Sequence, residues 1–434
     1  MDRLDPPTTC AIWKDLLTDV MAREAINLDA VCDDGTNFYP FIETFNGRCD
    51  SAQRGKNTQG RATLRPVSYA LLCHADSQVP LYDAVYDGNR HDTKQFPVMI
   101  EHFHDFLSHT FGDTPQSPQL TLIFDKGKNS KENFHLIESL KLHSVGSIKL
   151  SEVKDRANIS NQDSRWIPCQ TLGLEKTQCF RIPQKIYGKQ RTLIVTYNAN
   201  LFQTQCLPLH HDITKAMTEL GTLRQKLQDR AHGLIKGGKC PTVASINKQC
   251  QAMLSRPYMQ RLIPYTVNRD DHDRPQLAYA LDHDVIKQLS DTYLGKNILV
   301  TDRDQWDNDQ IILAYRSQFH IANVFKEMQD RDIGSWWPLY HWTDQKINVH
   351  SFYCTIAVLL RALAHRRVTG AGIDISMKRL LAELDEIKEV IVLYPKKRGA
   401  KTAPQHTVLS KTSELQQALL SILHVKPEEI VLLG

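Results

Sequence analysis

The spacing of apolar, strand-like runs within residues 29–150 constrains the fold of this chain more than any other feature. The first run, Ala30 to Cys32, closes on Asp33-Asp34-Gly35, which predicts a strand that ends in a turn. Two more runs, 66–73 and 79–86, follow after short turns, and three such strands make an antiparallel meander. Helix and strand then alternate, with predicted elements at 92–110, 120–124, 131–142 and 144–149. The order predicts an α/β fold with a mixed sheet flanked by helices.

The second half of the chain has a different pattern. Residues 185–198 resemble a hairpin that turns near Gly188, and a long polar helix is expected around 211–232. We interpret this stretch as a partly β insertion that interrupts the first sheet. Helices at 308–329 and 344–367 then return to the core. The expected divisions are 1–28 (helical remnant), 29–150 (core, first part), 151–300 (insertion), 301–370 (core, second part) and 371–434 (helical and strand extension).

Length and composition narrow the class of protein. A chain of 434 residues is too long for one hydrophobic core, so at least two folded units are expected. The 53 Lys and Arg against 49 Asp and Glu give a net charge of +4, which permits nucleic-acid binding without requiring it. The 10 cysteines form no CxxC pair, which argues against a zinc ribbon or a disulfide framework and favours a reduced, cytoplasmic protein. No signal peptide or membrane-spanning run is expected.

Two aspartates, Asp34 and Asp125, each follow an apolar run. Carboxylates held at the ends of neighbouring strands can bind hard divalent cations through oxygen. A pair of such ions can activate a nucleophile and stabilise the leaving oxygen in phosphodiester chemistry. An aspartate after a strand is also a common turn former, so spacing alone leaves both interpretations open.

The residues around these aspartates are more specific. Five blocks occur in a fixed order: Asp34-Gly35-Thr36-Asn37-Phe38 with Gln53-Arg54-Gly55-Lys56; Pro80-Leu81-Tyr82 through His91-Asp92; Phe124-Asp125-Lys126-Gly127; Tyr315-Arg316-Ser317-Gln318 with Phe325-Lys326; and His341-Trp342-Thr343-Asp344-Gln345-Lys346-Ile347. Together they resemble insertion-sequence transposases of the DDE type, in the IS-four superfamily subgroup with a long inserted domain. The resemblance implies an RNase H-like core.

One position departs from that family. In that family, the block that carries the third catalytic acid runs from a tyrosine through a basic residue to a catalytic glutamate and then a lysine. Counted from Tyr315 as the tyrosine, the basic, glutamate and lysine positions are Gln318, Ala322 and Gln329. A methyl group cannot bind a metal, so Ala322 marks a missing third carboxylate. Either the chain is an engineered catalytic mutant or it is a naturally degenerate or repurposed transposase. Gln329 favours decay, since a designed change would alter a single residue, but it also fits ordinary variation.

The resemblance implies the remaining roles. Asp34 and Asp125 would hold Mg²⁺ or Mn²⁺ in a two-metal centre, weakened without the third carboxylate. The partner would be double-stranded DNA, at transposon ends and target, bound by a homodimer in the bacterial cytoplasm at the nucleoid. Residues expected to contact DNA are Arg54, Lys56, Lys126, Tyr315, Arg316, Trp337, Trp342 and Lys346.

Two alternatives stay open. The chain could be a catalytically dead, domesticated relative that binds DNA as a regulator or defence factor, or an RNase H-like nuclease with a different substrate. Few residues precede Asp34, whereas the family usually carries a sizeable end-recognition region there, so we expect either a truncated chain or a domesticated form.

Overall fold

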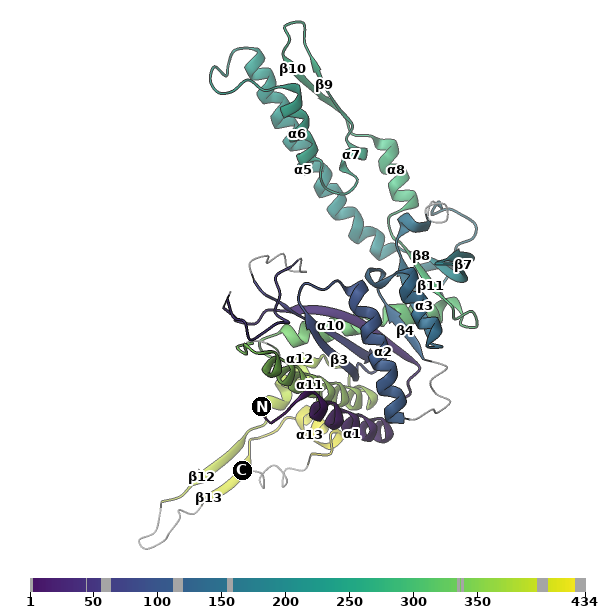
Figure 1. Ribbon diagram of the computed structural model, residues 1–434, viewed down its shortest axis with the longest axis vertical. Helices are drawn as coiled ribbons and strands as arrows, with labels where there is room; N and C mark the ends of the chain where they lie inside the picture. The colour runs from purple at the N-terminus through teal and green to yellow at the C-terminus, as the bar shows by residue number, and fades with distance from the viewer. Residues whose placement is uncertain are drawn as a thin grey trace. The chain divides into compact units, whose positions relative to one another are not determined.

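The computed structural model describes residues 3–43, 45–55, 64–111, 120–153, 159–333, 336, 339–395 and 405–425. It divides into two compact units (Figure 1). Unit 1 comprises Met1–Val145 and Leu313–Gly434, and unit 2 comprises Gly146–Ile312.

Unit 1 is built on a mixed sheet. Its strands lie in the order β3-β2-β1-β4-β5, with bounds β1 (Ala30–Phe38), β2 (Val67–His74), β3 (Pro80–Asp87), β4 (Thr121–Phe124) and β5 (His143–Ile148). β1 pairs antiparallel with β2 and parallel with β4, and β2 pairs antiparallel with β3. This strand order and these directions are those of an RNase H-like core, so the predicted fold class is confirmed.

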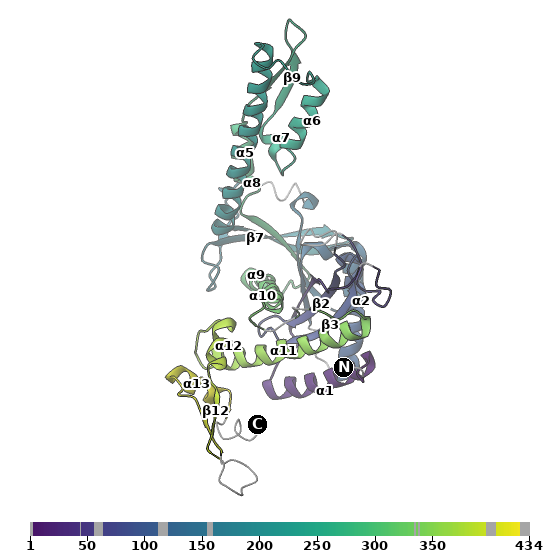
Figure 2. The same ribbon diagram turned by 90° about the vertical axis from the view of Figure 1, so that its left-hand side faces the viewer.

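Helices cover both faces of the sheet in unit 1. One face carries α10 (Gln318–Gln329) and α11 (Asp344–Gly370), and the Tyr69 hydroxyl of β2 lies 2.9 Å from the Thr355 hydroxyl of α11. The other face carries α2 (Asp92–Phe111) and α3 (Lys131–Ser139), whose rings Phe96 and Phe134 pack on Phe124 of β4. Figure 2 shows α1 (Pro6–Glu24) beside α11.

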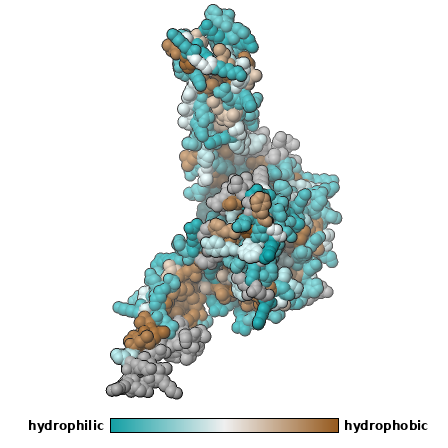
Figure 3. Space-filling model, turned by 60° about the vertical axis from the view of Figure 1, so that its left-hand side comes forward, coloured by the Kyte–Doolittle hydropathy of each residue, from teal (hydrophilic) through white to brown (hydrophobic). Residues whose placement is uncertain are grey.

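The C-terminal part of unit 1 forms a small satellite. It contains α12 (Met377–Asp385), the two-stranded ribbon β12 (Glu389–Leu393) and β13 (Gln405–Leu409), and α13 (Glu414–Ile422). A separate apolar cluster that includes Leu380 and Leu419 holds it against the end of α11. Every residue of β12 is exposed, and apolar surface is visible there in Figure 3.

Unit 2 has its own strands and core. β6 (Ile167–Pro168), β7 (Thr177–Ile186), β8 (Lys189–Asn198) and β11 (Lys296–Thr301) pair antiparallel in the order β11-β8-β7-β6. The predicted hairpin is present, and Tyr187 and Gly188 both have positive φ, as a tight two-residue turn requires. A helical part follows: α5 (Ala199–Ala231), α6 (Val243–Met253), α7 (Met259–Leu262) and α8 (His283–Thr292), with the ribbon β9 (Tyr265–Arg269) and β10 (Pro275–Tyr279). Leu220, Ile246 and Leu289 are in its core.

Two predicted boundaries are wrong. The helix predicted over 308–329 is two helices, α9 (Asn308–Arg316) and α10, separated by Ser317. The Ser317 hydroxyl donates to the Ala314 carbonyl at 2.6 Å, and this local bond competes with the regular helical ladder. The long helix predicted over 211–232 begins earlier, at Ala199, where the Asn198 side chain caps it.

Among the described residues, α11 is long and apolar enough to cross a bilayer by length and composition alone. Buried core helices of other proteins meet the same criterion, and 56% of the apolar stretch of α11 is buried in the fold.

Candidate carboxylate site

The sheet brings Asp34 and Asp125 together. The parallel register pairs Cys32 of β1 with Ile123 of β4, so each aspartate lies two residues beyond a paired position on its strand. Neighbouring strands are about 4.8 Å apart, which makes these residues lateral neighbours. That Asp34 and Asp125 bind a metal ion remains a prediction.

The predicted turn at Asp33-Asp34-Gly35 is wrong. β1 continues to Phe38 because β2 pairs with it along its whole length, with Asp34 opposite Leu71. Asp-Gly favours a turn locally, but cross-strand pairing overrides that preference. Asp34 instead lies where the shorter β4 ends, which leaves one side of β1 open at the aspartate.

The two carboxylates are positioned by backbone groups. Asp34 accepts a hydrogen bond from the Gly35 amide at 2.8 Å, and its side chain is 35% exposed. Burial raises the pKa of Asp34, while the Lys128 ammonium opposes that shift. Asp125 accepts from the Gly127 amide at 2.9 Å and caps the short helix η2 (Lys126–Lys128). Two partly buried carboxylates side by side are a suitable start for a cation site.

A buried ion pair lies beside this site, and the sequence analysis did not identify it. The Lys128 ammonium is 2.8 Å from Asp33 and 4.0 Å from Asp34, with the Lys128 and Asp33 side chains 5% and 2% exposed. Burial alone would lower the pKa of Lys128, but the charges of Asp33 and Asp34 raise it. The only sequence signal was a second lysine three residues after Asp125, placed inward by η2. Lys128 therefore puts a fixed positive charge next to the carboxylates.

Helix α10 places residue 322 on the Asp34 side of β1. The Ser317 hydroxyl is 3.2 Å from the Cys32 thiol at one end of the helix, and Gln329 donates to the Thr36 hydroxyl at 3.2 Å at the other. Cys32, Asp34 and Thr36 share one face of the strand because side chains alternate. Ala322 lies between the two contacts and two helical turns before Gln329, so it is on the same side of α10.

No acid of α10 replaces the missing one. Glu327 is the helix's acidic residue, and burial raises its pKa while Arg361 and His365 are the positive charges that act on it. Arg361 and His365 belong to α11, so Glu327 faces that helix. Asp92 lies near the site but acts on Asp33 and Tyr86, on the opposite face of β1.

The residues predicted to contact DNA fall into three groups. Lys126 is exposed next to Asp125, and Tyr315 and Arg316 are half-buried at the end of α9. Arg54, Trp342 and Lys346 belong to a second area, described next. Lys56 and Trp337 lie outside the described residues.

The loop that carries Arg54 is fastened to the start of α11. Asp344 accepts hydrogen bonds from the Asp50 amide at 2.8 Å and the Ser51 amide at 3.1 Å. Arg48 lies over the Trp342 ring at 5.3 Å, and that ring is 48% exposed. An exposed tryptophan beside an arginine suits stacking on a base together with phosphate contact.

Trp336, by contrast, is a packing residue. It is 1% exposed, and its ring stacks on Phe38 with centroids 4.1 Å apart. It is therefore unavailable for stacking on a base.

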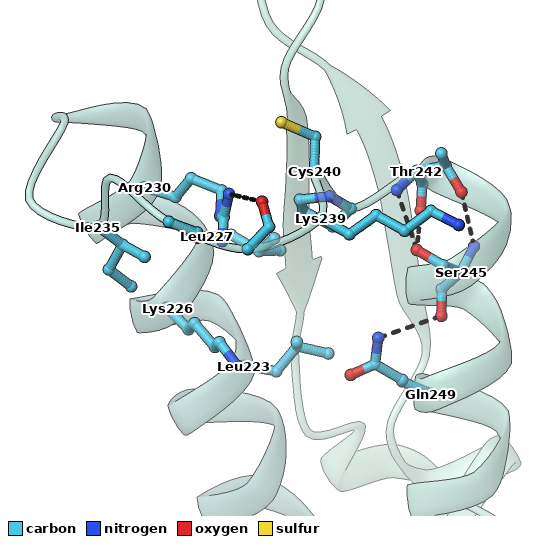
Figure 4. A pocket seen from close by; sticks show the side chains of 13 residues that line it. Leu223, Lys226, Leu227, Arg230, Ile235, Lys239, Cys240, Thr242, Ser245 and Gln249 are labelled. Carbon is cyan, nitrogen blue, oxygen red and sulfur yellow. Dashed lines mark hydrogen bonds between the residues drawn. The ribbon is translucent and has the colours of Figure 1, made fainter.

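A basic hollow lies within unit 2 (Figure 4). It has a volume of about 620 Å³ between the end of α5 and the start of α6, and Lys226, Arg230 and Lys239 contribute positive charge to its lining. Arg230 donates to the Gly237 carbonyl at 2.7 Å, which ties the loop to α5. The first turn of α6 is already satisfied by a capping box of Thr242 and Ser245. The hollow is suited to an anionic group.

No family model matches the chain, and no curated protein matches it. Among solved structures it is similar to a Mos1 transposase paired-end complex with left transposon end (10% identity, TM-score 0.20, 33% of this chain and 43% of that one). It is also similar to a pre-cleavage Mos1 transpososome (10% identity, TM-score 0.19, 31% of this chain and 41% of that one). A third similar structure is a Mos1 mariner paired-end complex with Mn (11% identity, TM-score 0.19, 33% of this chain and 43% of that one). The chain spans less than half the length of each, and TM-scores this low give the likeness no weight for the chemistry of the site.

Proposed function

We propose that this chain is a DDE transposase-like DNA-binding protein whose cleavage centre is impaired by the alanine at position 322. The observation that carries the proposal is the convergence of Asp34 and Asp125 on adjacent strands, with α10 bringing residue 322 to the Asp34 face. The order of sequence blocks supports the same assignment, down to the insertion-sequence subgroup. The substrate would be double-stranded DNA at transposon ends and target, bound by a homodimer in the cytoplasm.

The donor set fits one divalent ion better than two. Asp34 and Asp125 offer carboxylate oxygens to a hard cation such as Mg²⁺ or Mn²⁺. A second ion on the Asp34 side would depend on residue 322, where alanine has no oxygen. When bound, such ions supply charge for the attacking and leaving oxygens of a phosphodiester. Lys128, 4.0 Å from Asp34, already neutralises part of the negative charge that would attract them.

DNA binding does not need the missing carboxylate. Phosphate contacts from lysine and arginine supply most of the salt-dependent affinity for DNA. The candidates in unit 1 are Arg54, Lys126, Arg316 and Lys346, and the basic hollow in unit 2 adds Lys226, Arg230 and Lys239. A dead, DNA-binding regulator is therefore the second candidate function, favoured by Ala322.

Restoring the carboxylate separates the two candidates. With Mg²⁺ or Mn²⁺, Ala322→Glu should raise cleavage of DNA that carries the element's ends by at least about 100-fold, because one well-placed electrostatic group contributes that much. Asn323→Glu is the matched control: it adds the same charge one residue on, about 100° around the helix, and should give no gain.

Two outcomes would count against the transposase proposal. Equal activity in both glutamate variants would show that position does not matter. Salt-sensitive DNA binding without any cleavage in Ala322→Glu would favour the regulator.

A further inference from the structure

Three metal-ligating side chains converge in unit 2, within a part of the fold that the carboxylate site does not use. Cys169 directly follows β6, Cys179 lies in β7, and Asp309 lies in the first turn of α9. Their ligand atoms all lie within 4.8 Å of one another, and both cysteines are buried. We propose that Cys169, Cys179 and Asp309 form a binding site for a thiophilic divalent cation of the zinc class.

The sulfur separation matches a shared ion. The two Sγ atoms are 3.7 Å apart. Tetrahedral zinc with Zn–S bonds of about 2.3 Å holds two sulfurs about 3.8 Å apart. A disulfide would need about 2.05 Å. The two thiols are therefore spaced as two corners of a tetrahedral site, with the Asp309 carboxylate as a third corner and a fourth open to water.

Strand pairing and a side-chain anchor hold the ligands in place without the metal. Ile167 of β6 pairs with Cys179, and the Cys169 amide donates to the Thr177 carbonyl at 3.0 Å. One oxygen of Asp309 accepts from the amides of Gln170 and Thr171 at 2.8 and 2.9 Å, which fixes the carboxylate beside the Cys169 loop. Little ordering is left to be done when the ion binds.

The charges also balance. As thiolates, Cys169 and Cys179 would match the two positive charges of the ion, and Asp309 would add one negative charge. Binding releases the two thiol protons to solvent and forms two metal–sulfur bonds and one metal–oxygen bond, with no change of oxidation state. The Arg181 guanidinium donates to the Asn308 side chain at 3.1 Å and lies close enough to act on Cys179, so it offsets the surplus negative charge.

The sequence analysis argued against a zinc ribbon because no CxxC pair is present. The ligands of a zinc ribbon are close along the chain. Here strand pairing and the start of a helix bring together ligands that are far apart in sequence, so motif spacing could not identify them.

Metal content and cobalt spectra test the site in the full-length protein. After dialysis against trace zinc, the parent should retain about one equivalent per chain. Cobalt should give the near-ultraviolet thiolate charge-transfer band and the visible bands of tetrahedral Co²⁺. Cys169→Ser and Cys179→Ser should each weaken zinc binding by at least about tenfold. Asp309→Asn keeps an acceptor for the two backbone amides, so it should weaken binding yet keep the charge-transfer band.

A thermal measurement guards against misfolded variants. Zinc should raise the Tm of the parent but not that of Cys169→Ser, and each protein is compared only with itself. Cys240→Ser, which removes an exposed thiol of the same unit, should behave like the parent. The proposal is overturned if the parent binds no zinc and shows no cobalt band. It is also overturned if a Cys169–Cys179 disulfide forms under reducing preparation, or if Cys240→Ser loses the metal equally.

Discussion

The two faces of strand β1 carry adjacent aspartates with opposite surroundings. Asp34 lies on the face covered by α10 and is 35% exposed, with a neighbouring carboxylate at Asp125. Asp33 lies on the face covered by α2 and α3, and its charge is matched by the buried Lys128. The candidate ligand Asp34 and the ion-paired Asp33 are therefore consecutive residues of β1. What covers each face, rather than the residue type, decides which role a carboxylate can take.

The same row of the sheet offers a further contrast. Asp34 is opposite Leu71, and Leu71 is opposite Asp83, so both aspartates share a face. Asp83 lies against α11, where the Ser351 hydroxyl donates to it at 3.0 Å. Burial raises the pKa of Asp83 to about 6.

The largest expected effect is on the Asp33 face of β1, which α2 and α3 cover. Lys128→Ala leaves Asp33 buried without its partner and should lower the free energy of unfolding by about 3–5 kcal/mol. Urea denaturation at neutral pH measures this change. Lys126→Ala, two residues away and exposed, should change it by less than about 0.5 kcal/mol. The double variant Asp33→Asn with Lys128→Met removes both buried charges, so it should recover most of the stability lost in Lys128→Ala. Equal stability of the two lysine variants would remove the contrast between the faces.

Asp83 gives the next largest effect, and the size of that effect depends on pH. Because the pKa is raised from 3.8 to about 6, the stabilisation is present below pH 4 and is lost as pH rises through about 6. Asp83→Asn should therefore match the parent near pH 4 and exceed its stability at pH 8 by up to about 3 kcal/mol. Thermal melts across this range measure the difference. A variant less stable than the parent at pH 8 would contradict the assignment.

Asp34→Asn and Asp33→Asn should have different effects on metal binding and stability, because the two side chains lie on opposite faces of β1. Because Asp34 is partly exposed, its loss should change the free energy of unfolding by less than about 0.5 kcal/mol. Mn²⁺ affinity, measured by calorimetry, should fall at least about tenfold. Asp33→Asn is the control with the opposite profile: stability changes, and the direct ligand remains. If Asp33→Asn abolished Mn²⁺ binding and Asp34→Asn did not, the two roles would be exchanged.

The smallest effect concerns DNA. Lys126→Ala removes one exposed charge beside Asp125 and should reduce the slope of log affinity against log salt by about 1. Gel shifts at several stated salt concentrations measure the slope. Trp342→Ala should weaken binding while leaving the slope unchanged, since stacking releases no counterions. An unchanged slope in Lys126→Ala would place the DNA elsewhere.

Much of unit 1 could be predicted from sequence because its signals are local. Apolar runs and short turns gave the order of strands and helices, and block spacing placed Ala322 on the helix that crosses β1. The turn at Asp33 failed because pairing with β2 outweighs the local preference of Asp-Gly. The single helix predicted over 308–329 is interrupted at Ser317, whose hydroxyl lies 3.2 Å from the Cys32 thiol of β1, a contact that the local sequence does not encode.

The missed features depend on contacts between distant segments. Lys128 becomes a partner of Asp33 only after η2 turns it inward. Cys169, Cys179 and Asp309 meet through strand pairing and a side-chain anchor that no periodicity encodes. Such sites need the tertiary structure before their chemistry can be recognised.

We infer that Asp34, Asp125 and the side of α10 at residue 322 enclose one divalent-cation centre. Anomalous diffraction from Mn²⁺ in crystals of Ala322→Glu tests it most directly. We expect a manganese peak bound by both aspartates, with the introduced carboxylate directed at it. A peak elsewhere, or an introduced carboxylate turned away from Asp34, would contradict it.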